Sequence, residues 1–189
     1  MIYLENITYN RIWSHKRKCG ENMREEQSAL EQKARSLLQE RGVELLDIAE
    51  LVYYLQAKYF DSLTMDTCLH NVNRVLAKRE VQHAILTGIE LDILAENNQL
   101  TEPLLDIIKR DEGLYGIDEV IAYSIVNVYG SIGITSYGYI DKQKPGILKK
   151  LNDHSSGKVH TFIDDIVGAI AAAASSRLAH SYAGDINEQ

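Results

Sequence analysis

The chain has 189 residues, of which 45% are hydrophobic and 25% charged, and it carries a formal net charge of −7. This length is near that of one ordinary domain and is enough to bury a hydrophobic core. The negative charge argues against general nucleic-acid binding, which needs basic patches to neutralise phosphates. No apolar run approaches the roughly 18–20 residues that span a bilayer, and no signal-peptide pattern opens the chain. Because its two cysteines suggest no disulfide framework, we expect a cytoplasmic protein without a transmembrane segment.

The first half of the chain predicts amphipathic helices that follow an irregular opening. Residues 1–22 show no clear period, so we expect an accessory or disordered extension before a single helical domain over residues 23–182. Apolar residues then recur at helical spacing. The predicted helices of this half cover residues 23–40, 45–59, 65–76 and 80–96. Thr64 is the expected N-cap of the third helix, because its hydroxyl can accept a hydrogen bond from a first-turn N–H.

The second half is predicted to be helical as well, with glycine-rich interruptions. Its predicted helices run from Thr101 to Arg110, from Ile117 to Tyr129, from Pro145 to Leu151 and from His160 to His180. The stretch 130–139 holds three glycines and predicts a turn with room for a short helix, and residues 183–189 read as a polar tail. Period-two strand patterns are essentially missing. The sequence therefore predicts an all-α, compact multi-helix bundle with a central C-terminal helix.

Two acidic pairs share one local pattern in the second half. Asp118-Glu119 and Asp164-Asp165 each follow an isoleucine and precede two aliphatic residues and then a small one. Both pairs fall in the first turns of apolar helices, where the partial positive charge of the helix end also favours ordinary acids. Small residues that follow the second pair would let another helix approach closely. Grouped carboxylates repel by up to about 4 kcal/mol per pair at an effective dielectric of 20, and a hard divalent cation relieves that repulsion.

A charged segment lies between these two pairs. Asp141 is a candidate further ligand, and Lys144, just before Pro145, is a candidate point charge for a phosphate group. Taken alone, the segment is more typical of an exposed charged turn before a helix.

The order of these residues resembles a known family. The pattern Tyr139-x-Asp141-x-x-Lys144-Pro145, then Gly157, then Ile163-Asp164-Asp165-x-x-Gly168 is similar to the C-terminal signature of the phosphatidylglycerophosphatase A family. The segment from Asp111 to Glu119 resembles that family's earlier acidic motif. From Met23 onwards the chain resembles a soluble Bacillus-type subgroup, some members of which carry a low-temperature-requirement label.

The resemblance implies a phosphatase. It implies Mg²⁺-dependent hydrolysis of phosphatidylglycerophosphate to phosphatidylglycerol and phosphate, a compact helical bundle, and assembly as a homodimer or homotetramer. The Pro-Gly-Thr and Gly-Ser rich segment and the membrane-spanning helices of the membrane-bound members are missing here. A phospholipid headgroup, reached by transient contact at a membrane surface, and a small soluble phosphomonoester are therefore both open as substrates.

The residues carry the following expected roles. The expected metal ligands are Asp118, Glu119, Asp141, Asp164 and Asp165, with Asp111 as a weaker candidate. Asp164 and Asp165 are also expected to be catalytic residues, and Lys144 is expected to bind the substrate phosphate. His160, four residues before Asp164, either protonates the leaving alkoxide or caps the helix.

Two non-enzymatic alternatives remain at this point. A structural or regulatory metal site predicts closed coordination, so that metal loss lowers stability without any turnover. A helical adaptor without metal predicts carboxylates that point outwards or pair with lysines. An enzyme predicts an open position beside Lys144.

Overall fold

The structure is a computed structural model of the full chain, and it describes residues 25–153, 155 and 157–187, the side chains from residue 183 onwards excepted. The expected extension over residues 1–22 lies outside the described residues. The described part of the chain forms helices joined by short turns, and none of its residues lies in a β-strand. This confirms the predicted all-α class.

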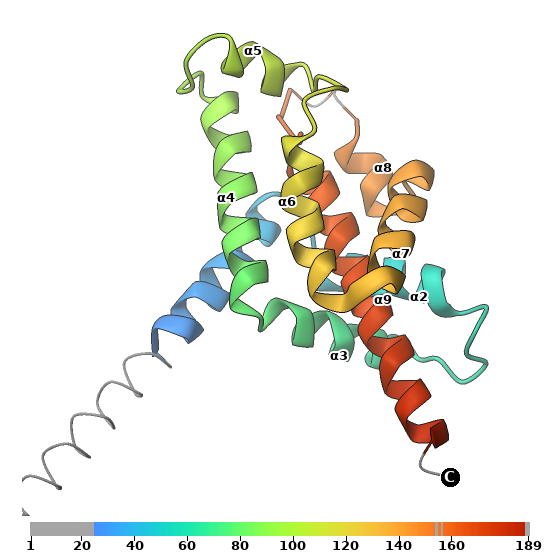
Figure 1. The fold of residues 1–189 in the computed structure, drawn as a ribbon. Helices are drawn as coiled ribbons and strands as arrows, with labels where there is room; N and C mark the ends of the chain where they lie inside the picture. The colour runs from blue at the N-terminus through green and yellow to red at the C-terminus, as the bar shows by residue number, and fades with distance from the viewer. Residues whose placement is uncertain (1–24, 154, 156, 188–189) are drawn as a thin grey trace, which may run out of the picture.

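The helices follow the predicted order closely. A helix over residues 25–40 is followed by α2 (Leu45–Gln56), α3 (Met65–Leu76), α4 (Arg79–Glu96), α5 (Leu104–Lys109), α6 (Ile117–Val126), the short 3₁₀ helix η1 (Asn127–Tyr129), α7 (Gly130–Gln143), α8 (Ile147–Leu151) and α9 (Ile163–Asn187) (Figure 1). Thr64 caps α3 as expected, because its hydroxyl accepts a hydrogen bond from the N–H of Thr67 at 3.2 Å.

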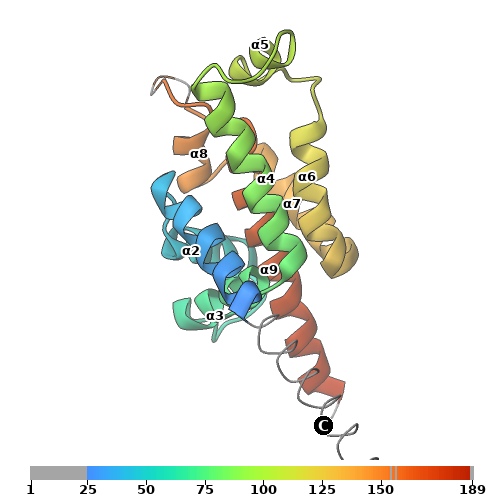
Figure 2. The same ribbon diagram turned by 90° about the vertical axis from the view of Figure 1, so that its left-hand side faces the viewer.

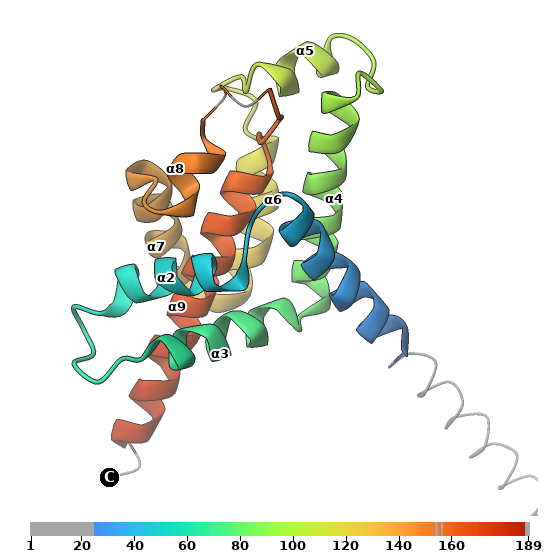
Figure 3. The ribbon, with the colours of Figure 1, turned by 180° about the vertical axis from the view of Figure 1, so that it is seen from behind.

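Helix α9 forms the centre of the bundle. It packs against α2, α3, α4, α6, α7 and α8, and every residue from Ile163 to Ser176 is buried. Helices α4 and α6 run alongside it, and α5 connects them across one end of the bundle (Figure 2). Helices α2 and α3 cross α9 nearer its C-terminal half (Figure 3). This burial accounts for the apolar, alanine-rich sequence of α9, since a helix that is apolar on every side is typically enclosed by the rest of the protein.

The predicted turn over residues 130–139 is wrong, because this stretch belongs to the 14-residue helix α7. A glycine inside a helix costs roughly 1 kcal/mol relative to alanine, and three of them suggested a break. Packing outweighs that cost, since Tyr137 and Ile140 are buried where α7 lies against α9. A methyl group added at Gly168 of α9 would stand only 3.7 Å from both of these side chains. The predicted close approach of a neighbouring helix to this small residue is therefore present.

The last helix differs from its predicted bounds. It begins at Ile163 rather than His160 and continues to Asn187, so its backbone is helical through most of the expected polar tail. No helix in the described residues is both long and apolar enough to cross a membrane.

Candidate metal-binding site

The acidic residues gather at one end of the bundle. The N-terminal ends of α6 and α9 meet the C-terminal end of α7 and the loop that follows α5 around a cavity of about 170 Å³. Its lining residues are Asp111, Glu112, Gly113, Gly116, Asp118, Glu119, Asp141, Lys144, Asn152, Thr161, Asp164 and Asp165. Seven of these side chains are carboxylates and one is an ammonium group. All of the predicted site residues except His160 are therefore brought together.

The two acidic pairs enter the cavity in the same way. Asp118 and Asp164 each stand in the first turn of a helix, and each accepts a hydrogen bond of 2.9 Å from the N–H of the next residue. Asp118, Asp164 and Asp165 are all buried, whereas Glu119 is exposed at the outer edge. The positive end of each helix favours the ionised form of these acids. The repeated sequence pattern thus corresponds to a repeated local geometry.

Lys144 is the cation of the cavity. Its Nζ lies 2.6 Å from Asp141 Oδ1, 2.8 Å from Asp164 Oδ2 and 3.7 Å from Asp165 Oδ1. Lys144 terminates α7 in the left-handed region with a φ of 44°, which is uncommon for a residue other than glycine. This conformation turns the chain out of α7 while its N–H still bonds the carbonyl of Ile140 at 2.8 Å.

The charges in the cavity are poorly balanced. Burial and, after it, the neighbouring charge of Asp164 raise the pKa of Asp165 to about 8. Burial likewise raises the pKa of Asp164 and of Asp118, although the Lys144 ammonium opposes both shifts. Burial alone would lower the pKa of Lys144, but Asp164 and Asp141 raise it above its ordinary value. One ammonium group is therefore too little positive charge for the carboxylates around it.

As the side chains stand, no three His, Cys, Asp or Glu residues of the described chain converge closely enough to hold a metal ion. Three carboxylates converge on the Lys144 ammonium instead. The donor set nevertheless suits a hard divalent cation, because every candidate ligand is a carboxylate oxygen. A cation there would offset the burial and the mutual repulsion that raise the pKa of Asp165.

Asp111 and His160 lie in different settings. Asp111 lines the cavity at the start of the segment after α5, with a φ of 51°. His160 is buried outside the lining residues, and its Nδ1 lies 2.9 Å from the carbonyl oxygen of Leu151. Burial lowers the pKa of this imidazole. Its Nε2 has no hydrogen-bond partner in the described structure. The ring therefore packs beneath α8 and does not cap α9.

The residue that caps α9 is Asp92, which the sequence patterns did not single out. This fully buried side chain on α4 accepts hydrogen bonds from the N–H groups of Phe162 at 3.1 Å and Ile163 at 3.1 Å. Burial raises the pKa of Asp92 to about 8 even though these bonds oppose the shift. The sequence held one signal for Asp92, which is a single acid on the apolar face of a predicted helix. A carboxylate that is buried there needs specific partners.

The fold and site together define a helical bundle with an acidic cavity where the N-terminal ends of two helices meet. The chain belongs to the phosphatidylglycerophosphatase A family, whose sequence profile it matches over residues 41–180. Every lining residue of the acidic cavity falls within that range.

Several relatives support this assignment. The uncharacterized protein YutG of Bacillus subtilis is 69% identical over 156 residues, which is 82% of this chain and 94% of YutG. The crystal structure of the low temperature requirement C protein from Listeria monocytogenes is 69% identical, with a TM-score of 0.82 over 83% of this chain and 99% of that one. A structure of a protein of unknown function from Bacillus stearothermophilus is 72% identical, with a TM-score of 0.79 over 80% of this chain and 94% of that one.

Proposed function

We propose that the protein is a Mg²⁺-dependent phosphatase that converts phosphatidylglycerophosphate to phosphatidylglycerol and phosphate. The observation that carries this proposal is the meeting of Asp118, Asp141, Asp164 and Asp165, from three helices, around one cavity with a single ammonium group. Family membership supports the reaction class. A cavity of this charge repels a free phosphate and needs a cation to admit one.

The carboxylates of Asp118, Asp141, Asp164 and Asp165 would hold the metal, with Glu119 and Asp111 at the edge. Bound there, Mg²⁺ would supply neutralisation of the phosphoryl oxygens and a water of lowered pKa. Catalysis of phosphoryl transfer rests on positioning and charge stabilisation, so a covalent nucleophile from the chain is not required.

In this proposal the ammonium of Lys144 can contact either the carboxylates of the cavity or the phosphate of the substrate. In the structure its ammonium forms ion pairs with Asp141 and Asp164. With those acids otherwise neutralised, the same ammonium would donate to a phosphate oxygen of the substrate. Because a lysine side chain is a flexible point charge, this change needs no movement of α7.

A metal-free adaptor is the second candidate, and one observation favours it. The adaptor predicts carboxylates paired with lysine, and Lys144 forms ion pairs with three of them. Among the described residues, however, no ion pair reaches the lining carboxylates of Asp118 and Glu119, which is why we prefer the phosphatase.

The substrate is tested by phosphate release from a panel. The purified chain is assayed with and without Mg²⁺ on phosphatidylglycerophosphate in mixed micelles and on soluble esters such as glycerol 3-phosphate. Release from the lipid supports the full proposal. Release confined to soluble esters keeps the reaction and replaces the substrate. No release from any ester, together with unchanged stability in Mg²⁺, contradicts the phosphatase and supports the adaptor.

Two further proposals accompany that of a lipid substrate. The protein works at the surface of the cytoplasmic membrane without spanning it, and it assembles as a homodimer or homotetramer. Pelleting with vesicles and sedimentation equilibrium test the two proposals separately.

A further inference from the structure

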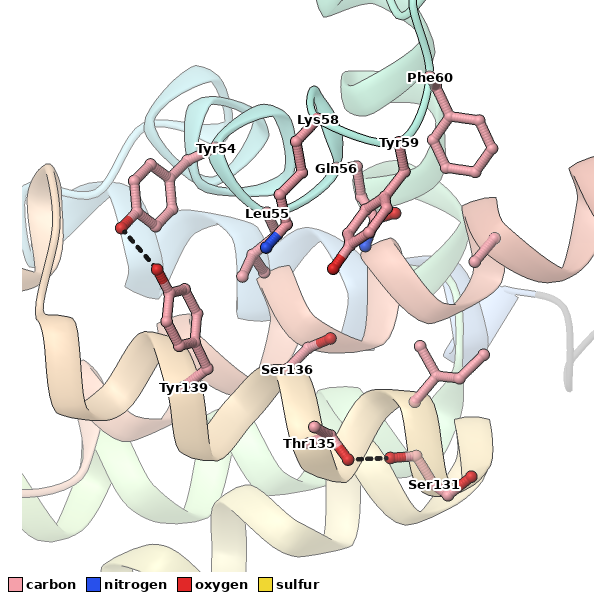
Figure 4. A pocket seen from close by; sticks show the side chains of 12 residues that line it. Tyr54, Leu55, Gln56, Lys58, Tyr59, Phe60, Ser131, Thr135, Ser136 and Tyr139 are labelled. Atoms are coloured by element: carbon pink, nitrogen blue, oxygen red, sulfur yellow. Dashed lines mark hydrogen bonds between the residues drawn. The ribbon is translucent and has the colours of Figure 1, made fainter.

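A second cavity lies on the other side of α7. It has a volume of about 850 Å³, which is within the range of small-molecule sites, and it opens between the end of α2, the segment after it, α7 and α9 (Figure 4). Its lining residues are Tyr54, Leu55, Gln56, Lys58, Tyr59, Phe60, Ser131, Ile132, Thr135, Ser136, Tyr139 and Ala179. We call it the tyrosine pocket.

The tyrosine pocket is separate from the acidic cavity. Tyr139 lines the pocket and Asp141 lines the acidic cavity, and two residues turn a helix by about 200°. These side chains therefore leave α7 in nearly opposite directions. The phosphatase proposed above leaves this pocket without a role.

One end of the pocket carries a cation. Lys58 Nζ lies 4.8 Å from the ring centre of Tyr59 and 5.8 Å from that of Tyr139. No carboxylate in the described residues forms an ion pair with it. Tyr54 stands beside Tyr139, with their hydroxyl oxygens 3.3 Å apart (Figure 4). An anionic group complements this end of the pocket.

A buried polar side chain also faces the pocket. Gln56 is 5% exposed, and its carboxamide has no hydrogen-bond partner among the described residues, although it lines the pocket beside Tyr59 (Figure 4). Because the amide lines the pocket and has no partner among the described residues, it can form a hydrogen bond with a ligand there. The hydroxyl of Ser136, on the facing wall, is a further donor that no protein group in the described structure engages.

The remainder of the pocket is elongated and largely apolar. Ser131 and Tyr139 both line it, and eight residues of α7 span roughly 12 Å. Phe60 lies towards the Ser131 end, away from Tyr139 (Figure 4). The wall is completed by Ile132 and Ala179. This shape suits a chain better than a compact ring.

We propose that the tyrosine pocket binds a single-chain anionic amphiphile, with its charged head beside Lys58 and Tyr139 and its hydrocarbon chain along α7 towards Phe60. Gln56 and Ser136 meet the oxygen atoms near the head. Both carboxylate and phosphate heads have the required chemistry. This site is independent of the phosphatase activity, so either proposal can fail without the other.

Calorimetric titration of the full chain tests this site. The probes are decanoate, decyl phosphate and the uncharged 1-decanol, all below their aggregation limits. Chelator is present, so that no cation draws phosphate to the acidic cavity. We expect one decanoate or decyl phosphate per chain, and the tighter of the two identifies the head group. Lys58→Met should weaken the anionic probes roughly ten-fold or more, because a charge-assisted contact is lost, and leave 1-decanol unchanged.

Two further variants separate this site from the rest of the surface. Ile132→Trp, at a partly exposed position, should fill the pocket and remove binding of all three probes. Lys149→Met, at an exposed lysine outside the lining residues, is the matched control and should bind like the wild type. Circular dichroism checks that each variant folds. The proposal is overturned if no probe binds the wild type, or if Lys58→Met and Ile132→Trp both bind as the wild type does. Self-association that Ile132→Trp abolishes, without amphiphile binding, would also overturn it and assign the pocket to a second copy.

Discussion

The ammonium of Lys144 and the carboxylate of Asp164 form a 2.8 Å ion pair that joins the end of α7 to the first turn of α9. Asp164 is buried, and Lys144 is only partly exposed. The pair therefore links two helix ends where negative charge is concentrated, and it is the contact that metal binding must alter.

Lys144→Met should destabilise the metal-free protein by about 2–3 kcal/mol, because it leaves buried carboxylates without their cation. Mg²⁺ should then raise the melting temperature of the variant more than that of the wild type, while phosphate release falls. Thermal unfolding with and without Mg²⁺ measures this. Lys142→Met, at an exposed lysine two residues earlier, is the control. Equal Mg²⁺ responses in the variant and the wild type would argue against metal binding at this cavity.

Asp92→Ala should lower the free energy of unfolding by about 1–2 kcal/mol or more, since it removes the cap of α9. The N–H groups of Phe162 and Ile163 lose their acceptor, and the turn that carries Asp164 loosens. Turnover should therefore fall as well. Asp92→Asn keeps one acceptor oxygen and should recover part of both losses. An Asp92→Ala protein with wild-type stability would show that the cap is dispensable.

Asp92 also makes stability depend on pH. Its pKa is raised from 3.8 to about 8 in the folded protein, so between these values the folded state binds more protons than the unfolded state. The free energy of unfolding then falls as pH rises through this window. Urea unfolding between pH 5 and 8 should show a larger fall in the free energy of unfolding for the wild type than for Asp92→Asn. If the free energy of unfolding falls as much in the variant as in the wild type, a group other than Asp92 causes the pH dependence.

Gly88 provides a test of the packing that sets α9 in place. A methyl group on Gly88 would stand 2.4 Å from Ile166 Cδ1 and 3.0 Å from Phe162 Cβ. Gly88→Ala should therefore destabilise by about 1–3 kcal/mol, as overpacked cores do. Gly138→Ala is the matched control, because that helical glycine faces open space. Gly138→Ala should stabilise the protein by roughly 0.5–1 kcal/mol. Equal effects of the two substitutions would mean that α4 and α9 are not in tight contact at Gly88.

Periodicity and capping were sufficient to predict most of the helices. Thr64 marked the start of α3 because an N-cap acts within its own turn. The acidic pairs were found for the same reason, since each lies in the first turn of its helix. Local rules failed at α7, where burial against α9 overrode the glycine signal.

Other contacts of the fold are non-local, and sequence patterns did not predict them. Asp92 meets Phe162 across 70 residues of chain. The tyrosine pocket joins Tyr54 to Tyr139 across 85 residues. Neither contact has a sequence period, because each depends on how separate helices pack. The position of Lys144 among three carboxylates also required the packed structure, although its role as a phosphate-binding charge remains a proposal.

The most direct test of the phosphatase is Mg²⁺-dependent phosphate release by Asp164→Asn. The matched control is Asp66→Asn, which alters another first-turn aspartate, on the exposed side of α3. With helicity checked by circular dichroism, we predict that Asp164→Asn loses release by at least a hundred-fold while Asp66→Asn retains the wild-type rate. A folded Asp164→Asn protein that releases phosphate as fast as the wild type would contradict the assignment of the acidic cavity as the active site.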